Sequence, residues 1–225
     1  MQSRRDPLID SGRQEDPLDI HALAVARPSD RTSWRALFRL DATLGRIVAD
    51  TRELALGQLR LAWWRETLSN ENRGEVQNPV FAAIDDAFGT SSKRLVTMVD
   101  GWETLLVAEQ LNDDALATYA AGRAAGFEVL GTSIGVSDNP QDLFLAGRIW
   151  ALADLCTHCS SPADVQTTLR HAVPLLSQRI RLTRPMRPLA LLAGLSRRSL
   201  FAGGAPLLGD RASPLVAMRL GLLGF

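Results

Sequence analysis

Two stretches decide the fold of this 225-residue chain: WRALFRLDATLGR at residues 34–46 and LGQLRLAWWRETL at residues 56–68. In both, large apolar side chains recur every three or four residues, which is the spacing of one face of an α-helix. Ser29, Asp30 and Ser33 are available to cap the first of these helices. The sequence therefore predicts two amphipathic helices early in the chain.

The remainder of the chain also carries helical signals. Asn-Pro, Asn-Asp-Asp and Ser-Pro sequences mark helix starts, because the first residue caps the helix and proline or acids suit the first turn. We expect further helices at about 78–88, 91–111, 112–130, 139–155, 161–180 with a kink at Pro174, and 189–201, and a last helix from Pro214. No segment alternates β-branched residues as a strand would.

The predicted fold is thus a single all-α domain of about eight helices, spanning residues 17–225. The first two dozen residues mix charges, Pro and Gly without a helical period, and we expect residues 1–16 to be disordered. Apolar residues make up 46% and charged residues 22% of the chain, as in ordinary soluble globular proteins. No apolar run reaches the roughly 18 residues of a membrane span, and acids interrupt the N-terminus where a secretory signal would be apolar. We expect a cytoplasmic protein without a nucleic-acid partner.

Charge is distributed unevenly along the chain. From Arg170 onward nine arginines face one acid, whereas residues 1–169 hold 16 basic and 24 acidic residues. Four arginines lie within nine residues, next to the apolar run 189–192: Arg179, Arg181, Arg184 and Arg187. This pattern indicates either peripheral attachment to an anionic membrane surface or packing of the basic segment against acidic faces of the same domain.

Possible metal or redox residues have simpler explanations. Cys156 and Cys159 are two residues apart and His171 follows, but zinc sites usually bring two separated ligand pairs. A reactive CxxC normally begins a helix, whereas this one ends a helix, so two buried or half-buried thiols are predicted.

The carboxylate pairs of the sequence also have simple explanations. The adjacent pairs Asp85-Asp86 and Asp113-Asp114 have no further acid one helical turn on, and the second suits a helix start. Asp50 and Glu53 have suitable spacing, but neighbouring arginines favour a salt-bridged surface.

Trp63 and Trp64 are adjacent on the second helix. Neighbouring helical positions point about 100° apart, so only one of the two indoles can lie fully in the core. The other must meet a second helix, a ligand or a partner. Trp and Arg dominate binding hot spots, which makes this segment a candidate contact surface.

The two opening stretches resemble the entry helices of the squalene/phytoene synthase family. YAAGRAAG at residues 119–126 is similar to a helix of that family's pocket, and GRIWALADLCTH at residues 147–158 is similar to a later family helix. The resemblance spans about residues 17–200 and implies an isoprenoid-synthase-like helical bundle. It is nearest to a subgroup of short members that includes a mitochondrial complex I assembly factor, regarded as non-enzymatic.

The resemblance also sets expectations for activity. Active members hold Mg²⁺ against a diphosphate through aspartate-rich clusters on two helices, and Mg²⁺ takes oxygen ligands. Here residues 43–48 read TLGRIV at the first cluster, and Thr157 and His158 replace Arg and Asp at the second. We therefore predict a non-catalytic, metal-free member that binds an isoprenoid-type lipid or a protein. Its expected ligand-binding residues are Tyr119, Asp154, Arg60 and Trp64. The alternative is an active Mg²⁺-dependent isoprenoid transferase, or a subunit of one, with the atypical ligands Asp41, Asp50 and Asp154.

Overall fold

The computed structural model describes residues 16–70 and 78–208, and within them every regular element is helical. The α-helices in this part of the chain are α1 (Pro17–Val25), α2 (Arg31–Asp50), α3 (Leu54–Ser69), α4 (Pro79–Phe88), α5 (Val96–Val107), α6 (Asp113–Ser133), α7 (Pro140–His158), α8 (Pro162–Leu176) and α9 (Arg187–Phe201). Short 3₁₀ turns cover Pro28–Asp30, Gly89–Leu95 and Arg184–Met186. The all-α prediction is confirmed. The helix expected from Pro214 and the segment 1–15 lie outside the described residues.

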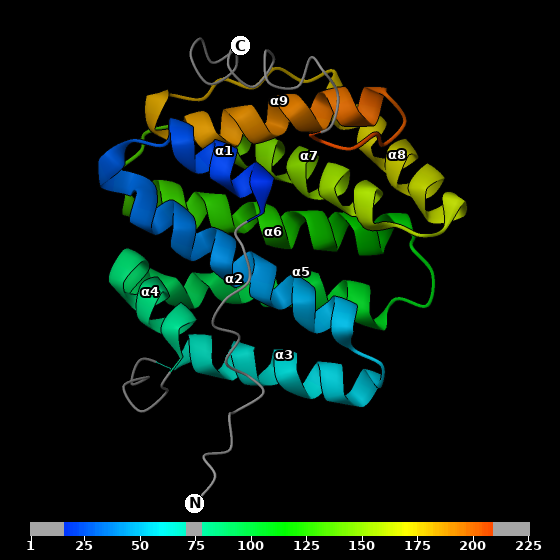
Figure 1. The fold of residues 1–225 in the computed structure, drawn as a ribbon, viewed down its shortest axis with the longest axis horizontal. Coiled ribbons are helices and arrows are strands. Elements are labelled where there is room, and N and C mark those ends of the chain that lie inside the picture. Colours follow the sequence, from blue (N-terminus) through cyan, green and yellow to red (C-terminus); the bar gives the residue numbers. More distant parts are fainter. Residues whose placement is uncertain (1–15, 71–77, 209–225) are drawn as a thin grey trace, which may run out of the picture.

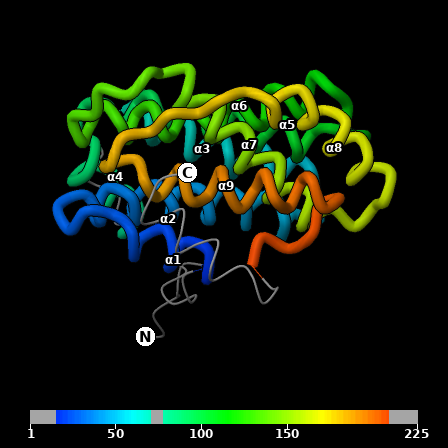
Figure 2. The backbone as a smooth tube through the Cα atoms, turned by 90° about the horizontal axis from the view of Figure 1, so that it is seen from above, coloured from blue at the N-terminus to red at the C-terminus, as the bar shows by residue number. Residues whose placement is uncertain are grey.

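Five helices form a stack in the order α3, α5, α6, α7, α9, each packed on the next (Figure 1). Helix α2 lies across this stack and contacts α4, α5 and α6, while α1 bridges α2 and α9. Viewed from above, α1 and α2 run along one side of the bundle and α8 lies at one end (Figure 2). This arrangement leaves a space between α1 and α2 on one side and α5, α6 and α7 on the other.

Four of the predicted caps form, whereas Asp30 begins α2 without a side-chain capping bond and pairs with Arg27 instead. The side chains of Asn78, Asn112, Asn139 and Ser161 each accept a hydrogen bond from a backbone N–H in the first turn of their helix. Asp113 and Asp114 occupy the first turn of α6, where the positive end of the helix dipole favours acids.

Two predicted helices differ from the structure, and one observed helix has no counterpart among the predicted elements. The stripe expected at 91–111 is divided into a 3₁₀ turn and the shorter helix α5. Helix α8 ends at Leu176, two residues after Pro174, instead of bending there and continuing to Ile180, because proline disrupts the helical hydrogen bonds around it. Helix α1 appears within a stretch that has little helical signal. Asp16 caps it, and Leu18, Ala22 and Leu23 are buried.

Two glycines set the spacing of the central helices. A Cβ on Gly122 of α6 would lie 2.6 Å from the carbonyl oxygen of Thr97 and 2.7 Å from Cα of Gly101 on α5. The α5 and α6 backbones can touch only because neither residue has a side chain. The small residues of this α6 segment therefore serve helix packing, which positions Tyr119 and Arg123 one turn apart beside the inner space.

Helix α3 is attached to the bundle through its WWRE segment. Trp64 is 4% exposed and stacks on Phe81 with ring centroids 4.4 Å apart. Arg65 forms ion pairs with Asp100, at 2.8 Å, and with Glu103, both on α5. The distinctive motif of the sequence thus holds α3 in place.

The basic segment after α8 combines exposed arginines with a buried apolar run. Arg179, Arg181 and Arg184 are exposed, but the apolar run beside them belongs to the core, where Leu189 and Leu192 are fully buried. Any contact with an anionic surface would have to rely on the arginines. Among the helices in the described residues, none has the length and apolar character needed to cross a bilayer.

Candidate functional site

A cavity of about 1080 Å³ lies between α1, α2, α5, α6 and α7. Its apolar walls come from several helices: Leu18, Ile20, Leu23, Phe38, Val48, Val80, Trp102, Leu105, Trp150 and Leu155. Arg39, Ala42 and His158 line it and are themselves exposed, so they mark where it meets the surface. Its volume is at the upper end of the range of about 300–1,000 Å³ that is usual for small-molecule sites.

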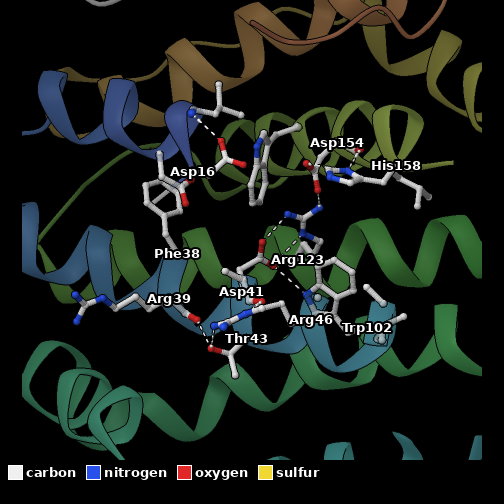
Figure 3. Close-up of a pocket in the computed structure, with 18 of the residues that line it drawn as sticks. Asp16, Phe38, Arg39, Asp41, Thr43, Arg46, Trp102, Arg123, Asp154 and His158 are labelled. Carbon is white, nitrogen blue, oxygen red and sulfur yellow. Dashed lines mark hydrogen bonds and ion pairs between the residues drawn. The ribbon is translucent and has the colours of Figure 1, made fainter. Parts of the chain in front are cut away.

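Arg123 is the centre of the polar part of this cavity (Figure 3). Its Nε and Nη2 donate to the two carboxylate oxygens of Asp41 at 2.9 and 2.5 Å. Its Nη1 donates to Asp154 at 2.7 Å and to the Tyr119 hydroxyl at 2.6 Å. Trp102 adds an indole N–H bond to Asp41 at 3.0 Å. Helices α2, α5, α6 and α7 are thereby joined in one hydrogen-bonded cluster.

Aromatic rings surround the Arg123 guanidinium. Its central carbon lies 4.0 Å from the Trp150 ring centroid, 4.9 Å from that of Trp102 and 5.5 Å from that of Tyr119. A cation near aromatic faces is attracted by the ring quadrupoles, most strongly where water is excluded. The chain's own guanidinium therefore fills an acidic and aromatic cage.

The charge states of this cluster follow from its burial and pairing. Burial lowers the pKa of Arg123, but Asp41, Tyr119 and Asp154 more than reverse this effect, so the pKa lies well above its ordinary value. Burial also raises the pKa of the Tyr119 hydroxyl. Arg123 is accordingly cationic and Tyr119 neutral at any physiological pH.

Asp19 of α1 is a half-buried carboxyl in the wall of the same cavity. Burial, with the nearby charges of Asp16, Asp41 and Asp154, raises its pKa from 3.8 to about 8, against the opposing effect of Arg123. Asp19 is therefore largely protonated at neutral pH.

A raised carboxyl pKa makes stability depend on pH. The folded protein keeps the Asp19 proton up to about pH 8, while the unfolded chain loses it near 3.8, so the contribution of Asp19 to stability falls as pH rises between these values. Asp19→Asn has no proton to lose. We expect the variant to gain stability relative to the parent as pH rises from 5 to 8, measured by urea unfolding at each pH. A stability difference that stays constant over this range would contradict the assignment.

A magnesium ion does not suit these residues. Both oxygens of Asp41 and one oxygen of Asp154 accept hydrogen bonds from Arg123, whose positive charge lies between the two helices. Mg²⁺ needs several oxygens in octahedral geometry and gives up its water reluctantly. In the described residues no group of three acids, histidines or cysteines has metal-binding geometry. Asp50 is exposed at the end of α2 and does not line the cavity.

The four ligand-binding residues expected from the sequence separate into two pairs. Tyr119 and Asp154 line the cavity, but Arg60 and Trp64 do not. Helix α3 lies at the far edge of the stack (Figure 1). Arg60 on this helix is exposed, and Trp64 packs on Phe81. The structure therefore brings only Tyr119 and Asp154 of these four together at this cavity. Sequence reasoning gives no role to Arg123, although a lone arginine among small residues in YAAGRAAG is a usable signal.

The cysteines lie away from this cluster. Cys156 is buried and Cys159 half-buried at the end of α7. Burial raises the pKa of Cys156 to about 11, which disfavours a reactive thiolate. His171 contacts Asp113 on α6, with Nδ1 3.0 Å from the carboxylate. The position of both thiols agrees with the prediction of unreactive, packed cysteines.

No family model, curated protein or solved structure matches this chain.

Proposed function

We propose that this protein is a non-catalytic member of the squalene/phytoene synthase type, which holds an isoprenoid-type lipid in the cavity between α1, α2, α5, α6 and α7. The resemblance of residues 34–68, 119–126 and 147–158 to that family supports the assignment. The apolar walls of the cavity and its volume of about 1080 Å³ suit a branched hydrocarbon chain.

One observation carries the non-catalytic part of the proposal: Arg123 bridges Asp41 and Asp154. These two acids lie on the two helices that resemble the metal-binding helices of active family members. A buried guanidinium paired with both carboxylates takes up the oxygens that a metal would need. The positive charge between these two acids is thus that of the Arg123 side chain.

The test is binding of farnesol, measured by isothermal titration calorimetry. We expect saturable binding without Mg²⁺. Ala42→Phe should weaken binding at least tenfold, because Ala42 lines the cavity and a phenyl ring would occupy its mouth. Ala55→Phe, on the exposed surface of α3, is the matched control and should leave binding unchanged.

Two outcomes would contradict the proposal. Mg²⁺-dependent consumption of farnesyl diphosphate with formation of a C30 product would favour the active transferase instead. Equal farnesol affinity in the Ala42→Phe and Ala55→Phe variants would place the ligand outside this cavity.

A second candidate function is binding to a protein through α3. Leu56 and Leu59 are 49% and 67% exposed, and half-buried Trp63 follows on the same helix. Apolar residues gathered on one exposed helical face favour a partner surface. This surface is distant from the cavity, so the two functions are separable by substitution.

A further inference from the structure

The indole N–H of Trp150 is an unused donor in the wall of the cavity. Trp150 is 4% exposed, and its Nε1 has no hydrogen-bond partner within residues 16–70 and 78–208. Arg123 covers the face of the ring at 4.0 Å, which leaves the indole edge for another polar group. A buried donor without a partner costs free energy, so a ligand atom that accepts a hydrogen bond there would be favoured.

An unused acceptor lies one helical turn away. Asp154 Oδ2 accepts a hydrogen bond from Arg123, while Oδ1 accepts none in the described part of the chain. The His158 Nδ1 lies 3.6 Å from Oδ1 and contacts the Asp154 carbonyl oxygen more closely, at 2.8 Å. Residues 150 and 154 share one face of α7, and both line the cavity.

Burial at this end of the cavity disfavours a further unpaired charge. Asp41 and Asp154 line the cavity and share a single guanidinium. Burial also raises the pKa of the nearby Asp19 carboxyl, which favours its neutral form. Arg35, Arg39 and Arg46 line the α2 wall, and Arg39 is exposed to solvent.

We propose that the cavity recognises the hydroxyl group of an alcohol, which accepts a hydrogen bond from Trp150 Nε1 and donates one to Asp154 Oδ1. This proposal rests on the proposed function and specifies the headgroup: an uncharged isoprenoid-type alcohol in place of a diphosphate. A hydroxyl group supplies one donor and two acceptor positions, which matches the two unused groups. It also adds no charge to the apolar cavity.

Three probes with the same hydrocarbon chain test the proposal: farnesol, farnesyl methyl ether and farnesyl diphosphate. The ether oxygen can accept a hydrogen bond from Trp150 Nε1, but it carries no O–H to donate to Asp154 Oδ1. We expect farnesol to bind about fivefold more tightly than the ether, since a hydrogen bond to a charged acceptor contributes at least about this factor. The diphosphate should bind more weakly than either, with or without Mg²⁺.

Two tryptophan variants separate hydrogen bonding by the Trp150 N–H from packing of the aromatic ring. Trp150→Phe keeps an aromatic ring but removes the N–H, and we expect about fivefold weaker binding of farnesol and of the ether. Trp34→Phe is the matched control. Its Nε1 is equally buried and without a partner in the described residues, yet Trp34 does not line the cavity. That variant should bind both probes as the parent does.

The outcomes distinguish the two proposals. Equal affinity for farnesol and its ether, with no effect of Trp150→Phe, would overturn hydroxyl recognition while leaving lipid binding intact. Tighter binding of the diphosphate would also overturn it. Failure of both farnesol and the ether to bind the parent protein would contradict the proposed function itself.

Discussion

Arg123→Met should lower the free energy of unfolding by about 3–5 kcal/mol, the range found when one partner of a buried ion pair is removed. Asp41 is 7% exposed, and within residues 16–70 and 78–208 it receives two of its three hydrogen bonds from Arg123. Without the guanidinium, its carboxylate stays buried, and Trp102 is the one donor left to it in this part of the chain. Urea unfolding at pH 7 measures the loss.

A double variant tests whether the loss comes from the stranded carboxylate. Arg123→Met combined with Asp41→Leu removes both charges and keeps the space filled, and such replacements are often neutral. We expect the double variant to recover most of the stability lost in Arg123→Met. If both variants were equally unstable, the cost would lie in packing around α6, and the ion pair would not be the reason.

Trp64→Ala should destabilise the protein by about 3–5 kcal/mol, as expected for truncation of a buried aromatic residue. The Trp64 indole is 4% exposed and stacks on Phe81 at an interplanar angle of 28°. Trp63 is half-buried and meets Trp64 and Phe81 only edge-on, with centroids 5.5 and 5.6 Å away. Trp63→Ala should therefore cost only about 1–2 kcal/mol.

The same pair of variants addresses the two candidate functions. Trp63→Ala should bind farnesol as the parent does, because Trp63 does not line the cavity. Trp64→Phe is the conservative control and should retain most of the stability by preserving the ring stack. Similar losses in Trp63→Ala and Trp64→Ala would show that both indoles belong equally to the core.

Local sequence determined the helical elements of this protein. Asn78, Asn112, Asn139 and Ser161 begin helices because their side chains bond the free N–H groups of the next turn, which depends only on neighbours along the chain. The apolar stripe of α2 likewise corresponds to buried residues, whereas Leu56 and Leu59 of the α3 stripe are exposed. The absence of acidic residues at 43–48 is also visible in the sequence alone.

Tertiary structure decided the site. Arg123 lies 82 positions from Asp41 and 31 from Asp154, and no local rule reveals that α6 places its guanidinium between α2 and α7. That placement depends on the close contact of Gly101 with Gly122. Helix α1 depends on its packing against α9 and α2, since its own sequence has little helical periodicity. The sequence also cannot tell that α3, with Trp64, lies outside the wall of the cavity. The helices form through short-range hydrogen bonds and the periodic burial of apolar residues. The cavity arises from contacts between helices that are distant in sequence.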